Sequence, residues 1–166
     1  MCWKCDNPDM THDDYLRLMR GLIDEHGWAV QYVEADRPHS PWAYTAGLTR
    51  FGQPELVVTG LPPRQACAYL NAIGSYLTRT ATPLPGDSFE LVGERVFEVV
   101  AVEQPLVHLP ITESLVGPDF EAIQMVWRDD RGKLPWDRGF RSGRWSQLVL
   151  GARAPSRCTC DHEPHR

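Results

Sequence analysis

The stretch that decides the fold reads Trp42-Ala-Tyr-Thr-Ala-Gly-Leu-Thr-Arg-Phe-Gly-Gln-Pro-Glu-Leu-Val-Val-Thr-Gly-Leu-Pro-Pro63. Two short runs in it, residues 42–48 and 55–59, are rich in aromatic and β-branched residues and predict strands. Between them, residues 50–54 (Arg-Phe-Gly-Gln-Pro) predict a turn. The closing pair of prolines predicts a helix start, because a helix tolerates proline in its first turn. The stretch therefore predicts strand, turn, strand and helix in succession.

One amphipathic helix is predicted before this stretch and a second one directly after it. Residues 11–26 place apolar side chains at helical spacing, with Thr11 and Asp14 forming a capping-box pattern and Gly27 at the expected end. The second helix follows Pro63, and its predicted apolar stripe comprises Ala66, Tyr69, Leu70, Ile73 and Leu77. Cys67 lies within that pattern, and we expect it in the core.

The remaining segments predict short strands. These are residues 28–33, a hairpin of 88–92 and 95–103 around Gly93-Glu94, residues 121–127, and a final strand or extended segment at 146–150. A short helix is expected near 112–116 and a turn at 129–132. The whole predicts an α+β fold, a mostly antiparallel sheet with two main helices, in a single domain over residues 1–166.

Composition narrows the classes of partner. The chain has 166 residues, a net charge of −5 and 42% hydrophobic residues, which is ordinary for a globular protein. A negative net charge argues against general nucleic-acid binding, which relies on a basic surface. No apolar run approaches the roughly 20 residues that span a membrane, and no signal peptide is evident. We therefore expect a cytoplasmic protein with no membrane or nucleic-acid partner.

Cysteines gather at the two ends of the chain. Cys2 and Cys5 form a C-x-x-C pair, and Cys158 and Cys160 form a C-x-C pair followed by His162 and His165. Thiolates and imidazoles at such short spacing are typical zinc ligands. We predict that clusters at residues 2–5 and 158–165 share one metal ion, expected to be zinc, which clasps the termini. The preferred ligands are the four cysteines, and His162 is the nearest replacement for one C-terminal cysteine.

Other interpretations of these cysteines stay open. Disulfides are disfavoured in a reducing cytosol, a thioredoxin-like motif is expected inside a fold rather than at residue 2, and the thiols can also be idle. Four protein ligands favour a structural metal, whereas three ligands and a water favour Lewis-acid chemistry.

Three stretches together resemble a known bacterial family. They are Met1-Cys-Trp-Lys-Cys-Asp6, the pair Pro41–Thr49 and Pro54–Leu61, and Gln124-Met-Val-Trp-Arg-Asp-Asp-Arg-Gly-Lys-Leu-Pro-Trp-Asp137. The family is domain of unknown function 4262, and the resemblance spans most of residues 1–150. It supports a single domain and implies no established activity.

Three residues in or just before the stretch 42–63 are candidates for a catalytic or binding role. His39 is a candidate general base or ligand in a polar loop, and Tyr44 and Glu55 are a candidate donor and a candidate general acid. Each also has a structural interpretation, as a backbone-bonded loop histidine, a packed tyrosine and a paired carboxylate. Asp129 and Asp130 fit a turn better than a metal site, and Trp127, Trp136 and Trp145 fit a ligand pocket or the core equally well.

The sequence contains no G-x-S-x-G elbow, P-loop, dinucleotide fingerprint or H-E-x-x-H motif. The favoured function is a binding domain with a structural zinc, whose surface around His39, Trp42 and Tyr44 meets a small ligand or a protein partner. The alternative is a small metalloenzyme with an open metal position. A flavin-dependent protein on a split-barrel-like sheet is a third hypothesis.

Overall fold

The computed structural model describes residues 9–36, 38–91 and 95–155. Two long helices, two short helices and one 3-10 helix accompany six strands in this part of the chain. The helices are α2 (His12–His26), α3 (Pro63–Leu77), α4 (Pro105–His108), α5 (Pro110–Val116) and η1 (Leu48–Phe51). The strands are β1 (Ala29–Val33), β2 (Trp42–Ala46), β3 (Glu55–Thr59), β4 (Ser88–Glu90), β5 (Val96–Ala101) and β6 (Ala122–Trp127).

The strands form one mixed sheet in the order β1-β2-β3-β6-β5-β4. Every neighbouring pair is antiparallel except β3 and β6, which run parallel with Glu55 beside Ala122. The predicted α+β class with mostly antiparallel pairing is therefore confirmed. The sheet is open, with β1 and β4 at its edges, so the split-barrel arrangement is wrong for the described residues.

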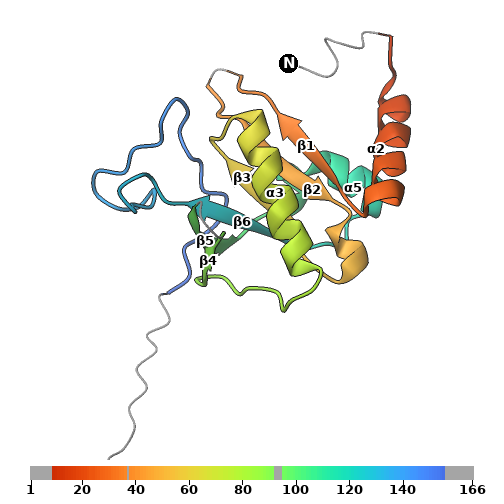
Figure 1. Ribbon diagram of the computed structural model, residues 1–166. Coiled ribbons are helices and arrows are strands. Elements are labelled where there is room, and N and C mark those ends of the chain that lie inside the picture. The colour runs from red at the N-terminus through yellow and green to blue at the C-terminus, as the bar shows by residue number, and fades with distance from the viewer. Residues whose placement is uncertain (1–8, 37, 92–94, 156–166) are drawn as a thin grey trace, which may run out of the picture.

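Helix α3 covers one face of the sheet, and the two short helices with α2 lie on the other side (Figure 1). The predicted stripe of α3 is buried in full, and it packs against Leu56, Val58, Phe97 and Met125 of the central strands. On the opposite face Met19 and Ile23 of α2 pack with Ala46 of β2 and with α5. Burying both faces explains why β3 and β6 consist almost entirely of buried residues.

Local signals in the sequence set the limits of α2. The Thr11 hydroxyl accepts the Asp14 N–H at 3.2 Å, and the Asp14 carboxylate accepts the Thr11 N–H in return, which confirms the capping box. Gly27 ends the helix with a φ of 93°, and its N–H bonds the Ile23 carbonyl. Such a φ is costly for any residue with a Cβ, so glycine suits this position.

Two expectations need correction. Cys67 is half-buried on α3 rather than a core residue, and burial raises the pKa of its thiol. Of the two alternatives expected for residues 146–150, a strand or an extended segment, the strand is wrong, because the bonds of these residues to the sheet come largely from side chains, as described below. The predicted hairpin strands pair as β4 and β5, while Gly93-Glu94 lie outside the described residues.

The described chain starts and ends on opposite sides of the fold. The segment before α2 lies at the top of Figure 1, whereas the last described segment, coloured blue, ends at the lower left. The predicted metal ligands Cys2, Cys5, Cys158, Cys160 and His162 all lie outside the described residues, so the clasp stays a prediction. No helix within the described ranges is long and apolar enough to cross a membrane.

Candidate functional site

The last part of the described chain is fastened to the sheet by two buried glutamines. The side chain of Gln124 on β6 donates to the Leu148 carbonyl at 2.7 Å and accepts the Leu150 N–H at 2.7 Å. The amide of Gln147 accepts the Trp127 N–H at 2.8 Å and donates to the Trp127 carbonyl at 2.9 Å. In a strand pair these backbone groups would bond the backbone of the neighbouring strand, but here the side-chain amides of the two glutamines take that role. Residues 146–150 therefore lie along the sheet without forming a strand of it.

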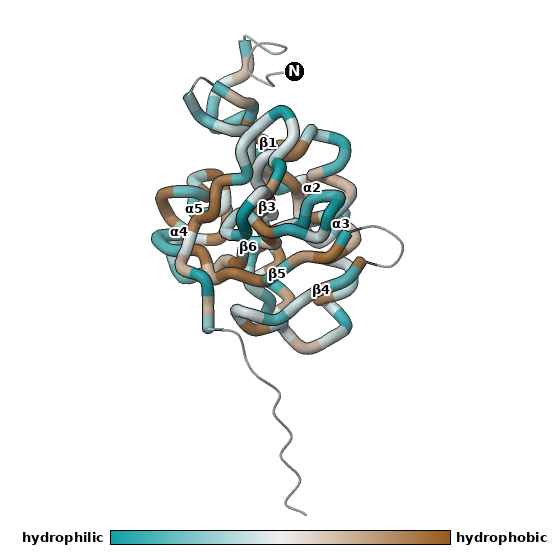
Figure 2. The backbone as a smooth tube through the Cα atoms, turned by 90° about the vertical axis from the view of Figure 1, so that its left-hand side faces the viewer, coloured by the Kyte–Doolittle hydropathy of each residue, from teal (hydrophilic) through white to brown (hydrophobic). Residues whose placement is uncertain are grey.

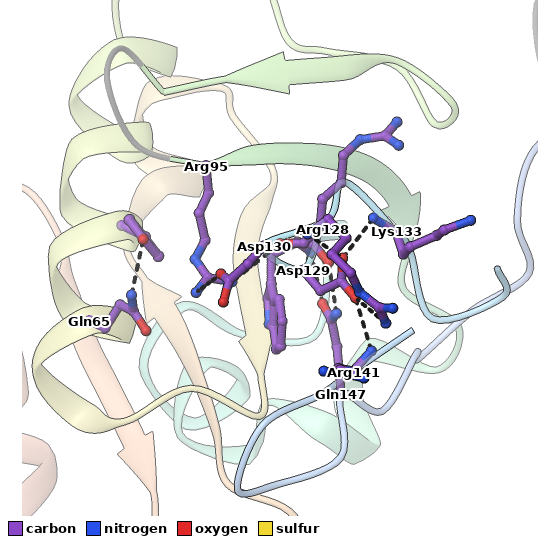
Figure 3. Close-up of polar contacts among 11 residues, drawn as sticks. Gln65, Arg95, Arg128, Asp129, Asp130, Lys133, Arg141 and Gln147 are labelled. Atoms are coloured by element: carbon purple, nitrogen blue, oxygen red, sulfur yellow. Dashed lines mark hydrogen bonds and ion pairs between the residues drawn. The ribbon is translucent and has the colours of Figure 1, made fainter. Parts of the chain in front are cut away.

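The preceding segment, residues 128–145, is folded into a closed loop by one aspartate. One carboxylate oxygen of Asp129 accepts the N–H groups of Arg131 and Lys133, both at 2.9 Å. The other oxygen accepts the Arg141 N–H at 3.0 Å, so the two ends of the loop meet at this carboxylate (Figure 3). The predicted turn at residues 129–132 is confirmed, with Asp129 as its anchor.

Several effects compete at the Asp129 carboxyl. Burial alone would raise its pKa, but the three backbone donors and the Arg131 guanidinium at 3.6 Å outweigh burial and hold the pKa below its ordinary value. The carboxylate is therefore ionised at neutral pH and already has its hydrogen-bond partners. It closes the loop and leaves little acceptor capacity for a ligand.

A cleft of about 180 Å³ opens between this loop and the start of β5. Its lining residues are Arg95, Trp127, Asp129, Asp130, Arg131, Arg141, Ser142 and Gly143. The Arg95 guanidinium lies over the Trp127 ring, 4.8 Å from its centroid, and donates to the Arg128 carbonyl at 3.2 Å. This stack holds a planar cation on an aromatic wall that is itself buried.

Positive charge exceeds negative charge at this cleft. Arg95 has one ion-pair partner among the described residues, the Asp130 carboxylate at 3.9 Å. The Asp130 side chain is 99% exposed, so solvent screens this pair. Among the described residues the Arg141 guanidinium has no hydrogen-bond or ion-pair partner. Residues 128–144 hold six basic and three acidic side chains in a chain whose net charge is −5. Such a concentration of cations favours an anionic ligand.

The structure assigns Glu55 a structural role. Its side chain is fully buried. One carboxylate oxygen accepts the Gly47 N–H at 2.9 Å, the Thr49 N–H at 3.1 Å and the Thr49 hydroxyl at 2.8 Å. The other accepts the Thr45 hydroxyl at 2.6 Å. We call this set of bonds the Glu55 latch.

The strand pattern predicted that β2 would end at Leu48. The latch explains why the strand ends at Ala46 instead. The chain turns at Gly47, where φ is 119°, so that the amides of Gly47 and Thr49 point at the carboxylate. A Cβ at Gly47 would also lie 2.9 Å from the Gly27 carbonyl oxygen. A buried and saturated carboxylate has no access to a substrate, which argues against Glu55 as a general acid.

Tyr44 is also a packing residue. Its ring is buried among Val57, Leu109 and Phe120, and its hydroxyl accepts the Ile111 N–H at 3.4 Å. Burial raises the pKa of the Tyr44 phenol well above its ordinary value, so the phenol stays protonated at neutral pH. The proposed surface of His39, Trp42 and Tyr44 is therefore not continuous, because Tyr44 does not reach solvent.

His39 is exposed, and its backbone N–H donates to the Asp36 carbonyl. It lines a second cleft, which it shares with Trp145 instead of with Tyr44. The three late tryptophans thus divide: Trp127 walls the first cleft, Trp145 walls the second, and Trp136 packs with Val100 and Leu134. The indole N–H of Trp136 is buried without a partner among the described residues.

The arginine cleft was not predicted from the sequence. Arg95 and Arg141 stand far apart along the chain, and neither belongs to a recognisable motif. The available signal was the excess of basic residues over 128–144 in an acidic chain, beside the Trp127 side chain. Within the described ranges no three histidine, cysteine, aspartate or glutamate side chains gather as a metal site.

Comparisons with known proteins agree with the resemblance noted in the sequence. Neither the curated proteins nor the solved structures contain a significant match to this chain. The model of one family, described as Domain of unknown function (DUF4262), matches residues 22–141. The match covers the Glu55 latch and most of the arginine cleft, but neither cysteine cluster. The latch and most of the cleft lie in the matched part, and the chain accordingly belongs to the DUF4262 family.

Proposed function

We propose that this chain is a binding domain whose cleft between Arg95, Trp127, Arg131 and Arg141 takes the anionic group of a ligand. The observation that carries the proposal is the Arg95 guanidinium, held over the Trp127 ring with one exposed carboxylate, that of Asp130, at 3.9 Å. A carboxylate or phosphate group is the chemistry that such a guanidinium recognises.

The geometry supports binding because the cation is already in place. Arg95 is held by its stack on Trp127 and its bond to the Arg128 carbonyl, so little side-chain freedom remains to be lost on binding. One N–H group of the guanidinium bonds the Arg128 carbonyl, and the others remain for an acceptor. Arg131 and Arg141 add positive charge at the rim, where it speeds the approach of an anion.

Binding of inorganic phosphate and of glutarate, followed by the arginine Nε–H NMR signals, tests the proposal. We expect saturable shifts of the Arg95 signal. In Arg95→Met the affinity should fall about 10-fold to 100-fold, the equivalent of a charge-assisted hydrogen bond worth ~1.5–3 kcal/mol. Arg17→Met removes an equal charge from an exposed helix position and is the matched control.

Equal loss of affinity in both variants would reduce the effect to overall charge and contradict a specific cleft. Arg95→Lys refines the reading, because lysine keeps the charge but loses the planar fork. If lysine restores full affinity, charge alone suffices and the stacked geometry is unimportant.

The zinc site remains a second proposal, supported by the ligand chemistry of the terminal cysteines and not by the described structure. Because the described ends lie on opposite sides of the fold (Figures 1 and 2), one shared ion requires both terminal segments to turn toward each other. Elemental mass spectrometry of untagged protein, beside a Cys158→Ser/Cys160→Ser variant, tests it. About one zinc per chain, lost in the variant, supports the site, and no zinc in the wild-type protein contradicts it.

The metalloenzyme alternative depends on the same metal. It requires a coordination position left open for water, whereas four protein ligands leave the metal structural. X-ray absorption of the zinc-loaded protein distinguishes these cases, since a sulfur-only shell of four ligands would exclude the open position.

A further inference from the structure

The second cleft has a volume of about 450 Å³ and resembles the first in its chemistry. Its lining residues are Ala35, Pro38, His39, Ser40, Arg144, Trp145 and Ser146. The Arg144 guanidinium lies over the Trp145 ring at 4.8 Å from the centroid, the same distance as in the Arg95–Trp127 stack. None of the described residues that line this cleft is acidic, and the hydroxyls of Ser40 and Ser146 add donors.

The two clefts are adjacent along the chain. Residues 141–143 line the first cleft and residues 144–146 line the second. The centres of these two triplets are three residues apart, and because the chain turns at residues 143–144 they lie closer together than the roughly 10 Å of a fully extended segment. In an extended peptide, side chains two positions apart lie on the same face, with their Cα atoms about 7 Å apart.

We propose that the two clefts together bind one extended acidic peptide segment, with one carboxylate at Arg95 and a second carboxylate at Arg144. This inference rests on the proposed function and names the class of ligand. Each guanidinium lies over a tryptophan ring, 4.8 Å from its centroid, and its N–H groups suit a carboxylate acceptor.

The spacing favours a peptide over a small monoanion. A single phosphate or carboxylate occupies one cleft and leaves the other cation unsatisfied, whereas a chain with two acidic residues engages both at once. The second contact is then intramolecular, which raises the affinity beyond that of either contact alone. Charge complementarity also fits, since the basic segment 128–144 stands out from an otherwise acidic chain.

The test uses the full chain and two synthetic eight-residue peptides. One carries glutamates two positions apart, on the same face of an extended chain, and the other has glutamine in place of the second glutamate. Calorimetry gives affinity and stoichiometry for the wild type, Arg95→Met, Arg144→Met and the double variant. Arg138→Met is the matched control, because Arg138 lies in the same loop, is exposed and lines neither cleft.

We expect one di-glutamate peptide per chain, bound about tenfold more tightly than the single-glutamate peptide. Arg144→Met should remove that tenfold advantage and leave the single-glutamate peptide unaffected, while Arg95→Met should weaken both peptides. Arg138→Met should behave as the wild type.

The remaining outcomes overturn the inference in separable ways. If Arg95→Met weakens binding and Arg144→Met does not, the first cleft stands and the second is no part of the site. Two peptides bound per chain would show that the clefts act independently. If neither arginine variant changes binding, both the inference and the proposed function fail.

Discussion

Replacing Glu55 by alanine should destabilise the fold severely, because the Glu55 latch satisfies donors that have no other partner. The Gly47 N–H and the Thr45 hydroxyl are buried and bond the carboxylate at 2.9 Å and 2.6 Å. Leaving a buried donor unsatisfied costs ~1–3 kcal/mol, so two such donors predict a loss of about 4 kcal/mol in the free energy of unfolding. A loss of that size is a large fraction of the 5–15 kcal/mol that is typical of a domain.

Glutamine at position 55 should cost far less. One oxygen of Glu55 accepts three of the four bonds, and the amide oxygen of glutamine can take its place. The amide nitrogen then faces the Thr45 hydroxyl, which must accept where it formerly donated. Losing one bond and the charge predicts a cost of about 1–2 kcal/mol for Glu55→Gln.

Urea unfolding at pH 7 measures these differences, with Glu121→Ala as the control for loss of an exposed carboxylate. We expect the order wild type, Glu55→Gln, Glu55→Ala, and a control within about 0.5 kcal/mol of wild type. In thermal unfolding, a loss of 4 kcal/mol corresponds to a Tm lower by about 8–16 °C for a domain of this size. A Glu55→Ala variant within 1 kcal/mol of wild type would refute the latch. If Glu55→Ala keeps the Tm of the wild type but loses ligand binding, Glu55 has a functional role and not a structural one.

Further predictions follow from single contacts. Gly151→Ala should destabilise the fold by at least ~2 kcal/mol, because its Cβ would lie 2.0 Å from the Ala101 carbonyl oxygen. Gly21→Ala, in an exposed helix position with nothing within 4 Å, should raise stability by about 0.5–1 kcal/mol, and equal effects in a melting comparison would contradict this reasoning. Gln147→Leu should cost about 2–3 kcal/mol, since it leaves two buried backbone groups of β6 unpaired, and should speed hydrogen exchange there; unchanged exchange would count against it. The lowered pKa of Asp129 means that its stabilising contribution is present above the ordinary value of 3.8 and is lost as the pH falls through the lowered pKa. Acid titration of the loop amides should show this opening in the wild type, and a similar opening in Asp129→Asn would contradict the assignment.

Much of the secondary structure was readable from neighbouring residues. The capping box of α2, the strand at residues 55–59 and the buried stripe of α3 depend on contacts between residues close in the chain, and these predictions are confirmed. Patterns of this kind report which face of an element is buried. They misjudged Cys67, because helical spacing places a residue near the core without showing how much neighbouring structure covers it.

The sites depended on contacts between distant parts of the chain. The residues around Glu55 in the sequence do not show whether its carboxylate contacts a substrate or bonds Thr45, Gly47 and Thr49. Tertiary packing determines which of these partners it has. Gln124 and Gln147 bond backbone groups 26 and 20 residues away in the chain, so no local period marks them.

By itself the sequence determined the α+β class, the two main helices, the family and the charge imbalance over residues 128–144. Tertiary structure decided the parallel pairing of β3 with β6, the burial of Glu55 and Tyr44, and the meeting of Arg95 with Trp127. The physical reason is the range of the interactions. Caps and amphipathic faces form within a few residues, whereas a cleft forms only after loop closure and core packing have brought distant side chains together.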